Sequence, residues 1–151
     1  MQYLKFSIKK NSIIILSFFI LTFAGCSKGG DSPAPTPPPV VITESDLVFR
    51  VDVAGSEVNY ASVFPVVGTS LIMNANITSK LPKDGVTIDV SVKKKSDNTV
   101  VFASNLSSSA ASNPVTVTGL TGGTLCVATI IVTSKSKSTN TSTKTFELAA
   151  K

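Results

Sequence analysis

Few residues in this chain could do covalent or acid–base chemistry. There are two cysteines, Cys26 and Cys126, and no histidine, so a Ser-His-Asp triad, a Cys-His pair and a histidine-ligated metal site are excluded. The carboxylates occur singly and form no Asp-x-Asp-x-Asp-Gly loop for calcium. We expect them to be exposed and solubilising: Glu44, Asp46, Asp52, Glu57, Asp84, Asp89, Asp97 and Glu147. The sequence therefore predicts no catalytic site, no metal site, no cofactor and no enzymatic activity.

Cys126 lies in an apolar run, and no basic residue stands close to it in the sequence. Without such a partner the pKa of its thiol is not lowered, so the side chain is expected to be unreactive. A free cysteine in these surroundings is typically a small buried hydrophobic residue. We therefore expect Cys126 in the core.

Residues 1–25 have the three parts of a secretory signal. A basic start with Lys5, Lys9 and Lys10 precedes an apolar stretch over 13–24, and the small residue Gly25 stands directly before Cys26. About a dozen apolar residues are too few for a membrane-spanning helix, which needs about twenty. We expect cleavage after Gly25, which makes Cys26 the first residue of the mature chain.

The six residues from Leu21 to Cys26 resemble the lipobox of bacterial lipoproteins. The match is closest over Ala24-Gly25-Cys26, while Phe23 stands where Leu, Val or Ile is usual. The resemblance implies a diacylglyceryl group on the Cys26 sulfur and a further acyl chain on its amine. Because two or more chains anchor a protein stably, it also implies lasting attachment to a membrane.

Residues 26–43 are predicted to be a disordered Pro/Gly-rich linker. The run 33–39 holds five of the chain's eight prolines, which favour an extended polyproline II conformation over packing. The start Cys26-Ser27-Lys28 resembles lipoproteins of the Bacteroidota. That resemblance implies the cell envelope, at the outer membrane, and leaves open whether the domain faces the periplasm or the cell surface.

The net charge of +5 does not indicate a nucleic-acid partner. Three lysines leave with the signal, so residues 26–151 carry 11 basic against 9 acidic side chains. This near balance lacks the electrostatic footprint that binding to a phosphate backbone requires.

Residues 44–151 are predicted to form one folded domain. Apolar and polar residues alternate along short runs bounded by Gly, Pro, Asn and Ser, which indicates half-buried strands. The runs are 47–53, 71–78, 86–92, 99–103, 115–117, 125–133 and 143–148. The run 125–133 is apolar on both sides, which predicts a central strand covered on both faces. Seven strands without a helical stripe predict a two-sheet antiparallel sandwich.

The segment from Leu120 to Val132 resembles the corner that leads into strand F of fibronectin type III domains. In both, a Leu and a Gly-Thr pair precede alternating apolar residues, and Cys126 stands where the family has a Tyr. The resemblance implies an immunoglobulin-like sandwich. The chain departs from it in lacking the tyrosine of that corner and any tryptophan for the core.

Phe49, Phe102 and Phe146 lie on predicted strands and are expected in the core. Tyr60 and Phe64 lie between strands and could form a small platform on which a sugar ring stacks.

The sequence favours a non-catalytic binding, adhesion or scaffolding module held on a membrane through lipid on Cys26. The alternatives are a glycan-binding accessory protein of a polysaccharide-uptake system and a subunit of a pilus-like assembly. The sequence does not specify the partner, which is a protein or a glycan.

Overall fold

The computed structural model describes residues 43–151, so the predicted signal peptide, the linker, Gly25 and Cys26 lie outside the described residues. Within this range the fold is all-β. Its strands are β1 (Phe49–Val53), β2 (Ser56–Glu57), β3 (Val63–Val66), β4 (Leu71–Ile77), β5 (Val86–Lys94), β6 (Val100–Ser108), β7 (Ser112–Val117), β8 (Leu125–Ser134) and β9 (Thr141–Ala150). Between 43 and 151, no helix has the length and apolarity that crossing a membrane would need.

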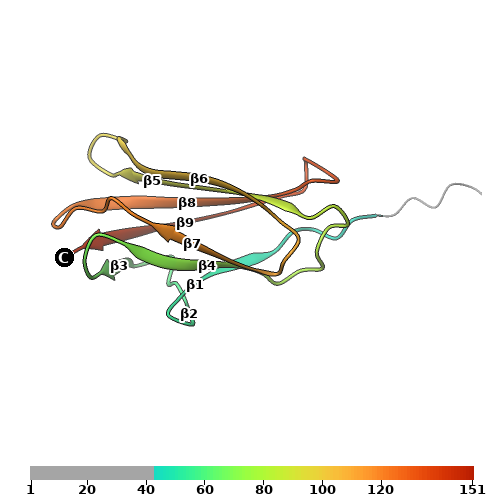
Figure 1. Ribbon diagram of the computed structural model, residues 1–151, viewed down its shortest axis with the longest axis horizontal. Coiled ribbons are helices and arrows are strands. Elements are labelled where there is room, and N and C mark those ends of the chain that lie inside the picture. Colours follow the sequence, from blue (N-terminus) through green and yellow to red (C-terminus); the bar gives the residue numbers. More distant parts are fainter. Residues whose placement is uncertain (1–42) are drawn as a thin grey trace, which may run out of the picture. The chain divides into compact units, whose positions relative to one another are not determined.

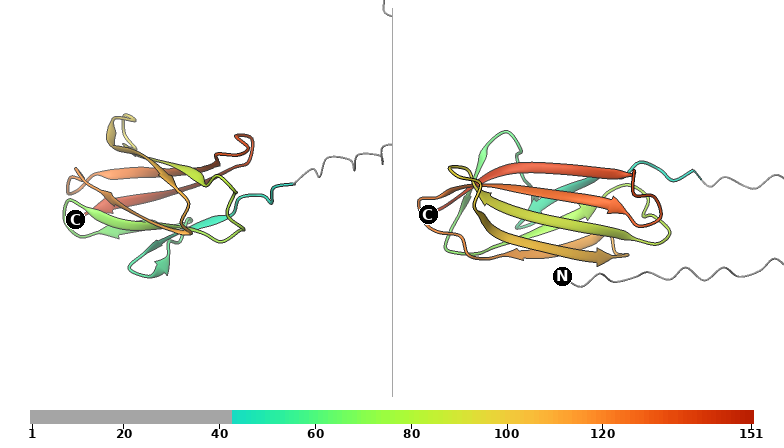
Figure 2. Two further views of the ribbon diagram at one scale, coloured as in Figure 1. Left: turned by 45° about the vertical axis from the view of Figure 1, so that its right-hand side comes forward. Right: turned by 90° about the horizontal axis from the view of Figure 1, so that it is seen from above.

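The strands form two sheets that face each other (Figure 1). The strand order is β2-β1-β4-β7 in sheet A and β3-β9-β8-β5-β6 in sheet B. Viewed from above, β9, β8, β5 and β6 run side by side (Figure 2). The pairings are antiparallel except for β3 with β9, which is parallel. The predicted two-sheet sandwich is confirmed.

Strict alternation along the strands explains why the two sheets pack. In β4 the buried residues Leu71, Met73, Ala75 and Ile77 alternate with more exposed ones, and β5 alternates in the same way from Val86 to Val92. Because successive side chains of a strand point to opposite faces, each sheet gains one apolar face. Burying these faces against each other removes them from water and stabilises the sandwich.

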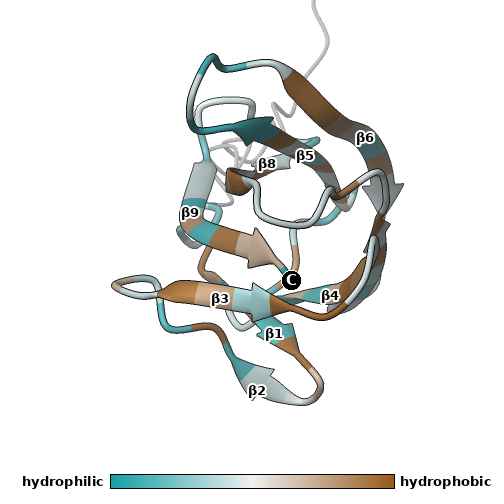
Figure 3. Cartoon of the chain, turned by 90° about the vertical axis from the view of Figure 1, so that its left-hand side faces the viewer, coloured by the Kyte–Doolittle hydropathy of each residue, from teal (hydrophilic) through white to brown (hydrophobic). Residues whose placement is uncertain are grey.

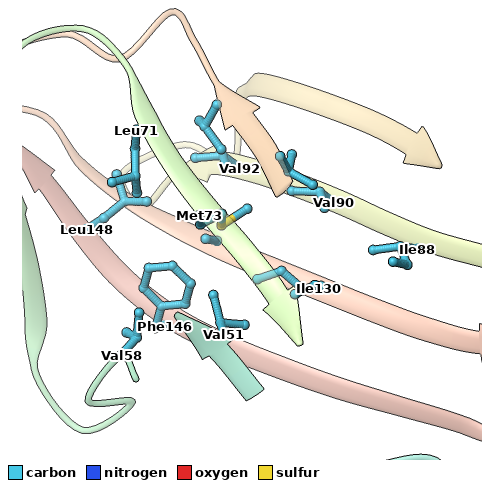
Figure 4. Packing of buried hydrophobic residues seen from close by; sticks show 14 of the residues in the cluster. Val51, Val58, Leu71, Met73, Ile88, Val90, Val92, Ile130, Phe146 and Leu148 are labelled. Atoms are coloured by element: carbon cyan, nitrogen blue, oxygen red, sulfur yellow. The ribbon is translucent and has the colours of Figure 1, made fainter. Parts of the chain in front are cut away.

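The core lies between the sheets (Figure 4). Phe146 of β9 and Met73 of β4 are among its largest buried side chains. Of the aromatic residues expected in the core, Phe49 and Phe146 are fully buried, whereas Phe102 is partly buried at the margin. The remaining buried side chains drawn and labelled in Figure 4 are Val51, Val58, Leu71, Ile88, Val90, Val92, Ile130 and Leu148.

Two sequence-based expectations differ from the fold. The segment 55–68 contains two short strands, β2 and β3, that alternation did not reveal, because two and four residues are too few to show a period. The expectation that the strand over 125–133 is covered on both faces is wrong. It is central in sheet B, as β8, but Val127, Thr129 and Ile131 on its outer face are only half-buried.

Candidate functional site

An apolar cleft of about 470 Å³ lies between β3 and the start of β4, and we call it the distal cleft. Its lining combines the β3 residues Phe64, Pro65 and Val66 with the end of β1 and the start of β4, which both belong to sheet A. The full lining is Val53, Ala54, Phe64, Pro65, Val66, Val67, Ser70, Leu71 and Ile72. Its volume falls in the range of ligand sites, about 300–1,000 Å³, and its lining is mostly hydrophobic, as such sites usually are.

Two side chains of the distal cleft are unusually exposed. Val67 is 90% and Ile72 is 66% accessible to solvent, although both are large and aliphatic. Single exposed apolar residues are ordinary, but these two line the same mostly apolar hollow, which makes it a candidate interaction site. Figure 3 looks onto this end of the domain and shows the apolar residues of β3 beside β1 and β4.

The distal cleft and the start of the described chain lie at opposite ends of the domain (Figure 1). β9 connects the two ends, because Asn140, just before β9, contacts residues 44–47, and Ala150, its last residue, pairs with Val66. Ten residues of strand span about 33 Å. The distal cleft therefore lies at the end of the domain opposite Thr43.

Tyr60 and Phe64 have different surroundings. Phe64 lines the distal cleft, whereas Tyr60 is not among the residues that line it. Both rings are half-buried and pack against the core. The structure therefore places one of the two candidate platform residues in the cleft and the other beside the edge of β1.

The Tyr60 hydroxyl has a structural contact. It accepts a hydrogen bond from the Val51 amide at 2.9 Å, on the edge of β1 where pairing with β2 ends. Burial of the ring is the main cause that raises the pKa of Tyr60, the Val51 hydrogen bond opposes it, and the nearby Glu57 raises it further. The Lys144 ammonium lies 5.0 Å from the ring centroid, within cation–π range.

At the opposite end, a group of hydrogen bonds, which we call the Asn140 clasp, fastens residues 44–47 to the β8–β9 loop. The Asn140 side chain accepts from the Leu47 amide at 2.8 Å and donates to Glu44 at 3.1 Å and to the Ser45 carbonyl at 2.9 Å. Glu44 also accepts from Ser134 at 2.7 Å. These bonds, first Ser134 and then Asn140, hold the pKa of Glu44 below its ordinary value.

The expectation that the carboxylates are exposed is wrong for Asp52. This residue is 6% exposed on the outer face of sheet A, where Asn76 donates to its Oδ2 at 2.7 Å and Arg50 lies 3.2 Å away. Asp52 Oδ1 has no hydrogen-bond partner among the described residues. An aspartate in an alternating strand normally faces water, so sequence alone offered no signal of this burial.

Cys126 is buried, as predicted, with 1% of its surface exposed. Burial raises the pKa of its thiol and outweighs the opposing effect of Lys94. Because the thiolate is the reactive form, both burial and the raised pKa make this side chain inert.

A second hollow, of about 560 Å³, adjoins the Asn140 clasp and has a different character. Lys80, Lys83 and Lys137 line it together with polar residues and Leu81. This hollow is larger than the distal cleft, Leu81 and Pro82 contribute apolar surface to it, and it lies at the end of the domain where the described chain begins.

Within 43–151, no group of three or more His, Cys, Asp or Glu residues is placed to hold a metal ion. No known protein family matches the chain, and no curated protein is significantly similar to it in sequence.

Proposed function

We propose that this protein is a lipoprotein of the cell envelope, anchored in the outer membrane through lipid on Cys26, that presents a non-catalytic β-sandwich for binding, adhesion or scaffolding. The lipobox-like residues before Cys26 and the Pro/Gly-rich linker after it support the anchor. The absence of histidine from the sequence supports a binding role over catalysis.

One observation of the domain carries the binding role. The distal cleft, with Val67 and Ile72 exposed, lies at the end of the domain opposite Thr43. A linker attached at Thr43 would leave this apolar surface at the end of the domain farthest from the attachment point. Binding of a partner that covers this surface would be favoured by the hydrophobic effect, because it removes Val67 and Ile72 from water.

We infer that the sandwich is immunoglobulin-like and of the fibronectin type III kind. In constant-type immunoglobulin domains the strand after C joins the sheet that contains A, B and E. Here β6, which follows β5 in the position of strand C, stays beside β5. Cys126 is the second residue of β8, which stands in the position of strand F. The Leu120 amide donates a hydrogen bond to the Thr69 carbonyl at the corner before this strand, where the family uses tyrosine.

The anchor is tested by metabolic labelling with radioactive palmitate in cells that express the full chain. We expect label in the parent protein and none in Cys26→Ser, because the serine oxygen does not replace the acylated sulfur. Mass spectrometry of the mature amino terminus should find an acylated cysteine. An unmodified thiol at that position would refute the anchor.

The binding role of the distal cleft is tested with chemical crosslinking on intact cells. Val67→Lys places a charge in the cleft, while Val48→Lys places the same charge at an exposed valine at the other end of the domain. We expect Val67→Lys to lose the crosslinked partner and Val48→Lys to retain it. Equal capture by the two variants would remove the cleft from the proposal.

A glycan partner is the second candidate, and the position of Phe64 in the distal cleft favours it. Aromatic rings stack on the apolar faces of sugars, so Phe64→Leu should weaken binding on a glycan array while keeping the cleft apolar. Phe102→Leu changes another half-buried ring outside the cleft and serves as the control. No binding by the parent protein would favour a protein partner.

A further inference from the structure

Three of the four sheet edges in the described domain carry features that prevent pairing with another strand. In sheet A, β2 is two residues long and contains Glu57, and β7 contains Pro114. In sheet B, β3 is four residues long and contains Pro65. Short strands, charges and prolines are the common means by which proteins protect exposed edges.

The fourth edge, β6, has none of these features. Its nine residues, Val100–Ser108, include no charged residue and no proline. Among the described residues no strand pairs with β6 on the side away from β5. The start of β6 is irregular, because its register with β5 shifts between Val100 and Phe102, and a Cβ placed on Gly119 would lie 3.5 Å from the Val101 carbonyl oxygen. The edge from Phe102 to Ser108 therefore presents free backbone donors and acceptors to another strand.

The sequence of β6 is complementary to itself in one antiparallel register. Phe102 and Leu106 lie two residues on either side of Ser104 and face the same side of sheet B. A two-fold axis through Ser104 would place Phe102 of one copy opposite Leu106 of the other, twice. Both are partly exposed, with Leu106 36% accessible, so the pairing would bury apolar surface left open in the single copy.

We propose that two copies of this chain associate through their β6 strands, antiparallel about Ser104, to form one continuous sheet from their two B sheets. Isologous two-fold contacts are the commonest symmetric interfaces. Cross-strand apolar pairs such as Phe102 with Leu106 are the units that stabilise a sheet.

Charge does not oppose this association. The carboxylate closest to the centre of β6 is Asp89, on β5, which accepts a hydrogen bond from Asn105. In the dimer the Asp89 side chains of the two copies would be at least three strand spacings apart, about 14 Å. Since the Debye length is about 8 Å in physiological salt, their repulsion is largely screened.

The small area of a single strand pair sets the strength of the dimer. Stable complexes bury about 1,200–2,000 Å² in total, and a pairing of the five residues 102–106 from each copy, about 17 Å long, falls below this. We expect weak association of dilute copies and substantial association when copies are confined together. The confinement rests on the proposed membrane anchor, whereas the pairing itself does not.

Cysteine crosslinking in intact cells that express the full chain tests the pairing. In Ser104→Cys the two α-carbons across the axis would lie about 4.5–5.5 Å apart, within disulfide range. In Ser107→Cys, three residues from the axis, they would lie about 20 Å apart. The parent protein is the control, because any disulfide-linked dimer that it forms must come from Cys26 or the buried Cys126.

We expect the disulfide-linked dimer of Ser104→Cys to exceed that of Ser107→Cys by at least about tenfold. Adding Ala103→Lys, an exposed charge on the edge, should abolish the crosslink of Ser104→Cys. Equal yields from the two cysteine variants would overturn the proposal, as would a crosslink that survives Ala103→Lys. If β6 instead receives a strand from another protein, Ser104→Cys would give no dimer, which also overturns it.

Palmitate labelling of the same cells separates this proposal from the proposed anchor. Labelled protein without the Ser104→Cys dimer would overturn the pairing and leave the anchor intact. A dimer without label would support the pairing and refute the anchor.

Discussion

The side-chain oxygen of Asn140 accepts a hydrogen bond from the Leu47 amide at 2.8 Å, joining residues 93 positions apart. Asn140 is 8% exposed, and its amide nitrogen is also used, by Glu44 and the Ser45 carbonyl. One side chain therefore fixes the place where the described chain begins against the β8–β9 loop. Any force transmitted through a linker would reach the sandwich at this clasp.

Asn140→Ala should lower the free energy of unfolding by about 2–3 kcal/mol, because it removes three hydrogen bonds and leaves the Leu47 amide buried without an acceptor. Urea denaturation followed by circular dichroism measures this change. Asn59→Ala, which removes one exposed local hydrogen bond, is the control and should cost less than about 1 kcal/mol. Equal losses in the two variants would contradict the role of the clasp.

Glu44 should make stability depend on pH in the acid range. Hydrogen bonds from Ser134 and Asn140 lower its pKa in the folded state below the ordinary 4.5. A lowered pKa contributes stability that is present above 4.5 and is lost as the pH falls through the folded-state value. The parent should therefore be more stable than Glu44→Gln at neutral pH, and the difference should shrink in acid. A difference independent of pH in urea titrations would contradict this origin.

Gly85 and Gly55 form a matched pair for a test of backbone packing. Both have positive φ, +79° and +83°, but a Cβ on Gly85 would lie 2.3 Å from the Ser108 carbonyl oxygen, whereas Gly55 has nothing within 4 Å. Gly55→Ala should cost about 1 kcal/mol from conformational strain alone. Gly85→Ala should cost about 3 kcal/mol or more, because β5 and β6 must also separate. Thermal unfolding of both variants measures the difference, and equal midpoints would contradict the close approach.

Tyr60→Phe should destabilise the domain by about 1 kcal/mol, since it removes the bond from the Val51 amide and retains the ring. Because the pKa of Tyr60 is raised, the folded state keeps the phenol proton at pH values where the unfolded chain has lost it. The parent should therefore lose stability as the pH rises above the ordinary value of 10.0. The variant should lack this part of the alkaline loss. Chemical denaturation at neutral and alkaline pH measures both effects, and identical alkaline slopes would contradict the buried position of the phenol.

Much of the fold followed from local pattern. Strands were predicted at β1, β4, β5, β7, β8 and β9, where apolar and polar residues alternate with a period of two. For β6 only 99–103 was predicted, and its second half was missed because the strand does not alternate. Cys126 was correctly expected in the core, since its apolar neighbours share its strand.

The candidate site followed from sequence only in part. Phe64 was singled out and does line the distal cleft, but Tyr60, chosen with it, instead contacts the edge of β1. Val67 and Ile72 were not identified, because nothing local distinguishes an exposed valine or isoleucine from a buried one.

The sequence by itself determined the all-β class, the strand positions and the lack of histidine chemistry, all of which depend on composition or on adjacent residues. Only the tertiary structure decided the parallel pairing of β3 with β9, the burial of Asp52, the Asn140 clasp and the bare edge of β6. Each of these depends on which distant segments meet. Which distant segments meet depends on the packing of the whole domain, and the preferences of neighbouring residues do not specify it.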